Sequence, residues 1–212
     1  MKNNNMEIAN ILKKFIVLEG LDGAGTTTQL KMLKQRFDER KIDSFSTMEP
    51  TDGVIGRVIR DALRKKIVLD DKTLALLFAS DRNEHLYGKN GIIEQIEQDR
   101  WVICDRYLFS SIAYQSLACD RSWIVDINNF PLPEYLFFIV TSPNECQKRM
   151  ENRMEKELFE DIKLQERILD NYNYGINRYK TSGIKVFYID GEEPIETINE
   201  KIWKILFPMP IK

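Results

Sequence analysis

The sequence has few of the residues that build disulfide or metal frameworks. Its 212 residues include three cysteines, Cys104, Cys119 and Cys146, and a single histidine, His85. The cysteines are odd in number, widely spaced and form no C-x-x-C pair, which argues against a structural zinc site. Buried thiols in a reducing compartment are therefore expected.

Long apolar runs and an excess of one charge are also missing. The longest apolar runs, such as residues 135–140, are too short to cross a bilayer, and residues 1–14 contain no apolar signal core. Lys and Arg number 31 against 33 Asp and Glu, a net charge of -2, so no overall basic field favours a nucleic-acid partner. We expect a cytoplasmic protein that acts without nucleic acid or membrane.

Strand-like and helical segments alternate along the chain. Apolar runs of strand length occupy residues 15–18, 101–104 and 135–140, and shorter strands are predicted at 44–47 and 185–189. Helical spacing is found at residues 27–40, 54–64, 72–87, 92–96, 110–117, from about 144 to 179, and 195–206. This alternation predicts one α/β domain over residues 1–212, with a parallel sheet covered by helices on both faces.

A glycine-rich turn follows the first predicted strand. Residues 20–28 read G-L-D-G-A-G-T-T-T, and Leu30, Leu33 and Phe37 then lie on one helix face. Glycines between a strand and a helix let several backbone N–H groups converge on a phosphate. In the pattern G-x-x-x-x-G-K-[ST], Thr26 takes the lysine position and Thr27 the hydroxyl position. The alternative is an ordinary glycine turn.

Polar residues follow the other predicted strands. Ligands of parallel sheets bind beyond the carboxyl ends of the strands. The glycine-rich turn, Asp105 and Asp190 all fall at such ends. The predicted binding edge therefore combines a turn suited to phosphate with two carboxylates.

Four segments carry a family resemblance. Residues 105–115 read D-R-Y-L-F-S-S-I-A-Y-Q and closely resemble the signature of thymidylate kinases. Residues 77–82 (L-F-A-S-D-R), Glu49-Pro50 followed by Arg60, and the glycine-rich turn are also similar to that family, in matching order from about residue 15 to 207.

The resemblance implies a fold and an activity. The expected fold is a P-loop NTPase-type three-layer sandwich with five parallel strands and a helical lid at about residues 148–161. The expected reaction transfers a phosphoryl group from ATP to dTMP with Mg²⁺, giving ADP and dTDP for dTTP biosynthesis. The family is usually homodimeric.

Candidate acceptor-site residues are predicted on two helices and one strand end. Phe78 and Arg82 lie four residues apart and so share a helix face, where a ring and a guanidinium suit a pyrimidine; the resemblance places thymine there. The alternative is a core aromatic and a surface ion pair. Arg106 follows a buried strand and suits a monophosphate. Further candidates for binding dTMP are Asp22, Glu49, Arg60, Ser111, Tyr114 and Gln115.

The ATP-binding candidates come mainly from the glycine-rich turn. The turn residues are Gly20, Gly23, Ala24, Gly25, Thr26, Thr27 and Thr28. Thr27 would ligate Mg²⁺, with Asp105 holding the ion through water. Arg149 and Asp190 match positions that lie near adenine in the family.

Residues 148–161 are strongly charged and correspond to the family's lid. Arg149, Arg153 and Lys156 share a helix face if this segment is helical; the alternative is a solvated charged helix. Family members without an arginine in the glycine-rich turn carry the catalytic arginine in the lid. We therefore predict Arg153 as catalytic, together with Arg106 and Asp22.

Two positions depart from the family pattern. Thr26 replaces the lysine, and Met48 replaces an arginine often found before Glu-Pro. Loss of one preorganised donor typically costs ~10²–10³ in rate. Compensation by lid cations, slow turnover and binding without turnover are the possible outcomes, and compensation is our hypothesis. The alternatives to a thymidylate kinase are a silent nucleotide-binding protein and a kinase for another deoxynucleotide or deoxynucleoside.

Overall fold

The computed structural model describes residues 10–151 and 162–208. Within these ranges, five strands form one parallel sheet in the order β2-β3-β1-β4-β5. The strands are β1 (Ile11–Gly20), β2 (Ser44–Met48), β3 (Trp101–Asp105), β4 (Leu132–Val140) and β5 (Lys185–Asp190). The predicted five-stranded parallel sheet is confirmed.

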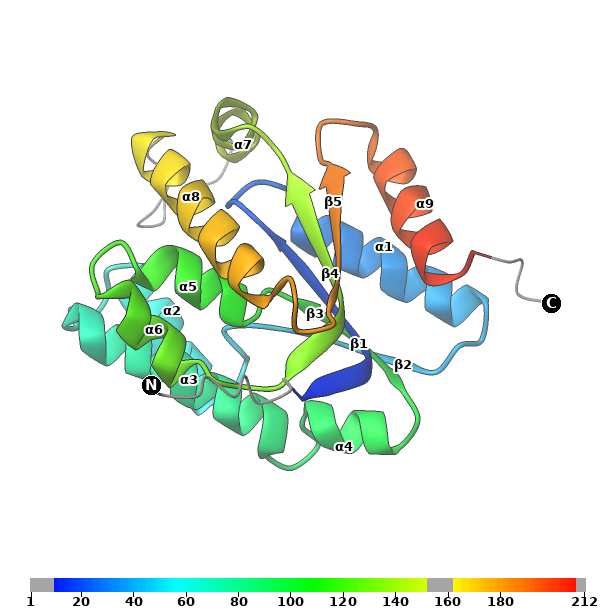
Figure 1. Cartoon of the computed structure of the whole chain (residues 1–212), viewed down its shortest axis with the longest axis horizontal. Helices are drawn as coiled ribbons and strands as arrows, with labels where there is room; N and C mark the ends of the chain where they lie inside the picture. Colours follow the sequence, from blue (N-terminus) through cyan, green and yellow to red (C-terminus); the bar gives the residue numbers. More distant parts are fainter. Residues whose placement is uncertain (1–9, 152–161, 209–212) are drawn as a thin grey trace, which may run out of the picture.

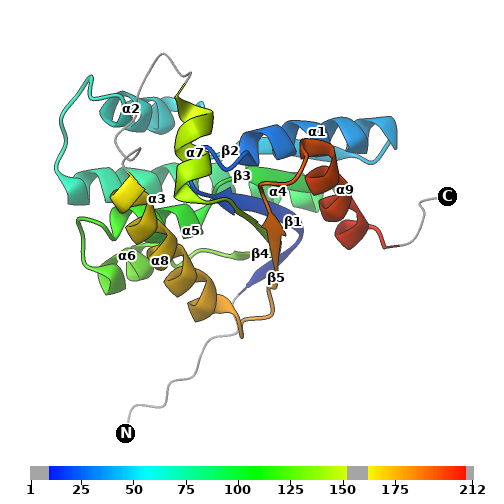
Figure 2. The same cartoon turned by 90° about the horizontal axis from the view of Figure 1, so that it is seen from above.

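Helices cover both faces of this sheet (Figures 1 and 2). Helices α1 (Thr26–Glu39) and α9 (Ile195–Leu206) pack together on one face, and α5 (Leu108–Gln115) and α8 (Ile162–Tyr179) pack together on the other. The remaining described helices are α2 (Val54–Leu63), α3 (Asp71–Tyr87), α4 (Ile92–Glu97), α6 (Arg121–Ile127) and α7 (Pro143–Met150). The arrangement is the predicted three-layer sandwich.

Burial of the central strand supplies much of the core. Residues 15–18 of β1 are fully buried, as are Val102, Ile103 and Cys104 of β3. Each fully buried large apolar side chain contributes about 1.5–3 kcal/mol relative to an exposed one. The rigid centre of the sheet therefore lies directly beneath the turn that follows β1.

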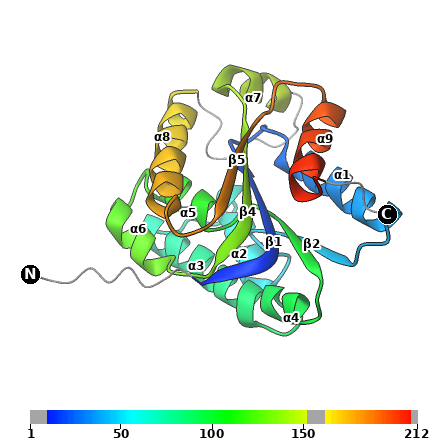
Figure 3. The same cartoon turned by 45° about the vertical axis from the view of Figure 1, so that its right-hand side comes forward.

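The carboxyl ends of the strands lie along one edge. The register pairs Leu18 and Met48 with Asp105, and pairs Gly20 with Ile139. Figure 3 shows β1, β4 and β5 running toward the same end of the molecule, where α7 lies. This edge therefore brings together the glycine-rich turn and the segments that follow β2 and β3.

Several predicted boundaries differ from the structure. Strands β1 and β4 begin several residues earlier than predicted, and α6 was not predicted. Cys104 and Cys146 are buried, but Cys119 is only half-buried, so its predicted burial was wrong. The predicted lid begins in α7 at residue 148, while residues 152–161 lie outside the described residues. None of the helices built by the described residues has both the length and the apolarity that a bilayer crossing requires.

Candidate nucleotide site

Two neighbouring cavities open at the carboxyl edge of the sheet. A cavity of about 550 Å³ follows the turn between β1 and α1, and we call it the loop cavity. A second, of about 230 Å³, lies between the end of β3 and helices α2, α3 and α5, and we call it the helix cavity. Asp22, Thr27 and Arg106 line both. The two cavities are therefore connected through shared side chains.

The glycine-rich turn has the backbone form that its sequence requires. Gly23 and Gly25 have φ angles of 89° and 99°, in the left-handed region that favours glycine. A Cβ on Gly23 would lie 2.6 Å from the carbonyl oxygen of Cys146 in α7. Gly25 caps α1, so the N–H groups of the first turn have no carbonyl to bond within the helix. The loop cavity is therefore suited to an anion.

Thr26 does not replace the missing lysine as a charged group. Its side chain is 5% exposed, and its methyl carbon would lie 3.5 Å from a Cβ on Gly20. Among the described residues that line the loop cavity, Arg106 and Arg149 carry positive charge. Charge for a bound polyphosphate must therefore come from outside the turn.

Arg149 and the end of β5 form the far wall of the loop cavity. The Arg149 Nη2 atom donates to the Gly191 carbonyl at 3.0 Å, and Nε donates to Glu145 at 3.0 Å. Asp190 accepts from the Glu192 amide at 2.9 Å, and it is the next residue, Gly191, that lines the cavity. The roles of Arg149 and Asp190 beside adenine stay predictions.

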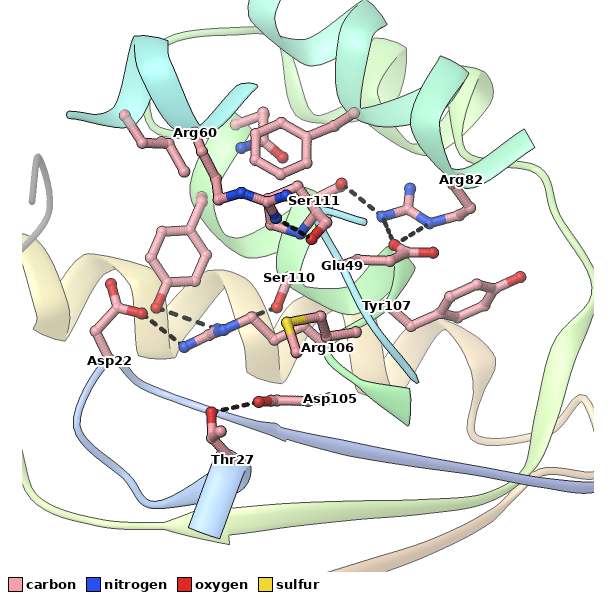
Figure 4. Close-up of a pocket in the computed structure, with 16 residues that line it drawn as sticks. Asp22, Thr27, Glu49, Arg60, Arg82, Asp105, Arg106, Tyr107, Ser110 and Ser111 are labelled. Atoms are coloured by element: carbon pink, nitrogen blue, oxygen red, sulfur yellow. Dashed lines mark hydrogen bonds and ion pairs between the residues drawn. The ribbon is translucent and has the colours of Figure 1, made fainter. Parts of the chain in front are cut away.

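Thr27 and Asp105 provide oxygen ligands of the kind that Mg²⁺ prefers. The Thr27 hydroxyl donates to Asp105 Oδ2 at 2.5 Å, and Asp105 Oδ1 is buried without a hydrogen-bond partner (Figure 4). No group of three or more His, Cys, Asp and Glu side chains suited to a metal occurs in the described ranges. A hydroxyl and one carboxylate fit Mg²⁺ that is bound mainly through substrate phosphates and water.

Arg106 lines both cavities, and Figure 4 shows its guanidinium turned toward Asp22. Its Nη2 donates to Asp22 at 2.6 Å, and Nη1 donates to the Gly20 carbonyl and the Tyr172 hydroxyl, each at 3.0 Å. Burial alone would lower the pKa of Arg106, but the Tyr114 and Tyr172 hydroxyls and the Asp22 carboxylate raise it well above its usual value. Arg106 is thus a fixed positive charge where the cavities meet.

Arg82 lies deep in the helix cavity and is held rigidly. It forms an ion pair with Glu49 at 2.7 Å and donates to Ser111 at 3.0 Å and to Asn128. The pair is buried, so the alternative of a surface ion pair is wrong. Phe78 is half-buried and lines the same cavity. A ring and a guanidinium therefore line the helix cavity together, and their roles beside a pyrimidine stay predictions.

The remaining predicted acceptor residues line the helix cavity as well. Arg60 donates to the carbonyls of Pro50 and Thr51 at 2.7 and 2.6 Å. The Tyr114 hydroxyl accepts from Arg106 at 3.4 Å. Gln115 is buried, and its Oε1 atom has no hydrogen-bond partner in the structure. The role of Gln115 toward a bound base stays a prediction.

Sequence reasoning missed the residues that support Arg106. Ser110 and Tyr172 accept hydrogen bonds from the Arg106 guanidinium. Glu19 accepts hydrogen bonds from Ser110, Tyr172 and the backbone of Tyr107. A charged residue at the end of a buried strand was the available signal for Glu19, whereas nothing distinguished Tyr172. Arg153 and Lys156 lie outside the described residues, so their predicted roles stay predictions.

The geometry defines a class, and the comparisons with known proteins define a family. A glycine-rich turn between a central parallel strand and the N-terminus of a helix is typical of P-loop nucleotide-binding proteins. The family model described as Thymidylate kinase matches residues 18–202. The chain belongs to the thymidylate kinase family.

Individual relatives agree with this assignment. A protein of Treponema pallidum named "Putative thymidylate kinase" is 42% identical over 91% of this chain and 94% of its own length. A "Probable thymidylate kinase" of Methanocaldococcus jannaschii is 42% identical over 74% of this chain and 79% of its own. One of Pyrococcus abyssi, with the same name, is 36% identical over 89% of this chain and 93% of its own. The similarity thus extends over most of each protein.

Proposed function

We propose that this protein transfers a phosphoryl group from ATP to dTMP and yields ADP and dTDP in nucleotide biosynthesis. The observation that carries the proposal is the position of Arg106, which lines both cavities and is fixed between them. A guanidinium in this position binds the phosphate of an acceptor nucleotide where it meets the phosphates of the donor. Membership of the thymidylate kinase family supports the choice of acceptor.

The loop cavity is the ATP site in this proposal. Backbone N–H groups of residues 23–28 bind the phosphates, and Arg149 contacts the base. Thr27 and Asp105 hold Mg²⁺, which neutralises charge on the transferring phosphoryl group when bound.

The helix cavity is the dTMP site. Phe78 stacks on the thymine, while Arg82 and Gln115 face its polar edge. Tyr114 lies against the sugar and disfavours a 2′-hydroxyl, and Asp22 accepts from the 3′-hydroxyl. The other dTMP-site residues in this proposal are Arg60, Glu49 and Ser111. Glu49 and Ser111 act by holding Arg82 in place.

Catalysis in this proposal depends on arginines rather than a loop lysine. Arg106 supplies charge from the described part of the site, and Arg153 supplies it from the lid. Together they compensate for Thr26. Asp22 orients Arg106 through the 2.6 Å ion pair.

A coupled assay with ATP-Mg²⁺ and four acceptors tests the proposal. We expect turnover with dTMP, weaker turnover with dUMP and dCMP, and none with thymidine, because thymidine offers Arg106 no phosphate. Equal or faster turnover of thymidine contradicts the proposal in favour of a deoxynucleoside kinase. Nucleotide binding with no turnover of any acceptor identifies a silent binding protein.

Three features of organisation also belong to the proposal. The chain forms a single domain, acts in the cytoplasm and assembles into a homodimer. Exposed apolar side chains on two adjacent helices support the homodimer, with Val54 of α2 71% exposed and Leu76 of α3 48% exposed.

A further inference from the structure

Glu19 is a buried carboxylate at the point where β1 ends. Its Oε1 atom accepts from the backbone N–H groups of Tyr107 at 2.8 Å and Ser110 at 3.2 Å. Its Oε2 atom accepts from the hydroxyls of Ser110 at 2.6 Å and Tyr172 at 3.0 Å. Four donors from two other segments therefore converge on one side chain, and Glu19 itself lines neither cavity as described.

The backbone that Glu19 holds is the turn that carries Arg106. Arg106 has a φ angle of 70°, which is unfavourable for a residue with a side chain and costs roughly 1–2 kcal/mol. The next residue, Tyr107, caps α5 but its side chain makes no capping hydrogen bond. Glu19, at the end of β1, supplies the missing capping acceptor for the start of α5. These hydrogen bonds oppose the backbone strain at Arg106.

A second set of contacts runs through the hydroxyl groups. The Tyr172 hydroxyl lies 3.0 Å from Glu19 and 3.1 Å from the Gly20 carbonyl, and it accepts from Arg106 Nη1 at 3.0 Å. Ser110 links the same carboxylate to the same guanidinium, because its hydroxyl accepts from Arg106 at 3.1 Å. Glu19 thereby fixes both the backbone of Arg106 and the position of its guanidinium.

We propose that Glu19 is a positioning residue for phosphate recognition, which it controls by holding Arg106 between the two cavities. The inference rests on the proposed function, because it concerns how that site recognises the acceptor phosphate. Glu19 contacts no nucleotide in this proposal. Its removal therefore weakens the binding of dTMP but leaves the binding of the nucleoside part unchanged.

The test compares dTMP with thymidine by isothermal titration calorimetry on wild type and Glu19→Gln, at a pH well above 7 so that Glu19 is ionised. The glutamine keeps the size of the side chain but turns an N–H group toward one pair of donors. We expect the affinity for dTMP to fall by about tenfold or more, the range for a lost charged hydrogen bond, while the affinity for thymidine changes less than about twofold. An equal loss for both ligands, or no loss for dTMP, overturns the inference.

Two further variants separate positioning from folding. Glu134→Gln is the matched control, since Glu134 also accepts a backbone N–H, from Lys14 at 2.9 Å, but lies outside the linings of both cavities. It should leave both affinities unchanged. Tyr172→Phe removes only the hydroxyl that links Glu19 to Arg106, so it tests that link if Glu19→Gln fails to fold. It should also weaken dTMP selectively, and an unchanged affinity for dTMP overturns the inference.

A double variant tests whether Glu19 acts through Arg106. If Glu19 acts through Arg106, adding Glu19→Gln to Arg106→Gln should cause no further loss of dTMP affinity. Additive losses overturn the inference. Failure of the proposed function has a different signature, because wild type itself would then bind dTMP no better than thymidine.

Discussion

Arg106 is the residue on which the proposed chemistry most depends. Its guanidinium is fixed by Asp22, Gly20 and Tyr172 and lines both cavities. Replacement by glutamine should lower kcat/KM for dTMP by ~10²–10³, the usual cost of losing one preorganised charged donor. Steady-state kinetics at saturating ATP measure the change. Arg57→Gln, on an exposed part of α2, serves as control, and an equal loss in both variants would contradict the assigned role.

Thr26 gives the second prediction at this scale. Because arginines are proposed to supply the missing charge, Thr26→Lys should change kcat by less than about tenfold, well below the ~10²–10³ that one essential donor provides. Gln35→Lys adds the same charge to an exposed position of α1 that lines neither cavity, and is the control. If wild type is inactive and Thr26→Lys restores its activity, the hypothesis of compensation by arginines is wrong.

Glu19 predicts a pH dependence of stability. Burial raises its pKa from 4.5 to about 7, against the opposing effects of Arg106 and the Ser110, Tyr107 and Tyr172 hydrogen bonds. Between these two pH values, Glu19 has lost its proton in the unfolded chain but keeps it in the folded protein. The free energy of unfolding should therefore fall as pH rises from about 4.5 to 7, by roughly 3 kcal/mol from this group, and then level off.

Urea unfolding of wild type and Glu19→Gln at several pH values isolates this contribution. All other titrating groups are common to both proteins, so they largely cancel in the difference. The stability of wild type relative to the variant should decline across that pH window. A difference that stays constant with pH would contradict the raised pKa of Glu19.

At the scale of elements, the glycine-rich turn is fitted against α7. A Cβ at Gly23 would meet the Cys146 carbonyl oxygen at 2.6 Å, and the φ angle of 89° adds backbone strain. Gly23→Ala should therefore shift the turn relative to α7 and raise KM for ATP by about tenfold or more, with a stability loss of ~1–3 kcal/mol.

Gly183→Ala is the matched control for this prediction. Gly183 has a φ angle of 99°, but its Cβ would meet only the end of the Ile11 side chain, at 3.1 Å. It should lose stability without any change in KM for ATP. Similar kinetic losses in both variants would show that the strain is general rather than local to the turn.

The elements also show what local sequence patterns could predict. The run 105–115 and the glycine-rich turn were recognisable because their residues are contiguous, and the buried strands were recognisable as apolar runs. The short helix α6 was missed because its two buried residues, Ile124 and Val125, are adjacent and show no helical period. The role of Glu19 was missed because its partners Tyr107 and Tyr172 lie 88 and 153 residues away in the chain. Such contacts exist only after the sheet has formed.

At the scale of the whole molecule, the proposed homodimer gives a prediction. Sedimentation equilibrium should give twice the chain mass of 25.0 kDa. Leu76→Glu places a charge on the exposed apolar part of α3 and should return the monomer mass, because an unpaired charge in an interface is strongly unfavourable. Tyr188→Glu, at a similarly exposed position on β5, should remain dimeric. A monomeric wild type would contradict the proposal.

The shared wall of the two cavities has a consequence for how ligands enter. Asp22, Thr27 and Arg106 belong to both chambers, and Arg106 forms an ion pair with Asp22. An anion that enters either cavity must compete with the Asp22 carboxylate for the Arg106 guanidinium. The first nucleotide to bind therefore loosens the Arg106–Asp22 ion pair, which the second nucleotide must also displace. The two nucleotides are therefore coupled thermodynamically, and each should increase the affinity for the other by the same factor.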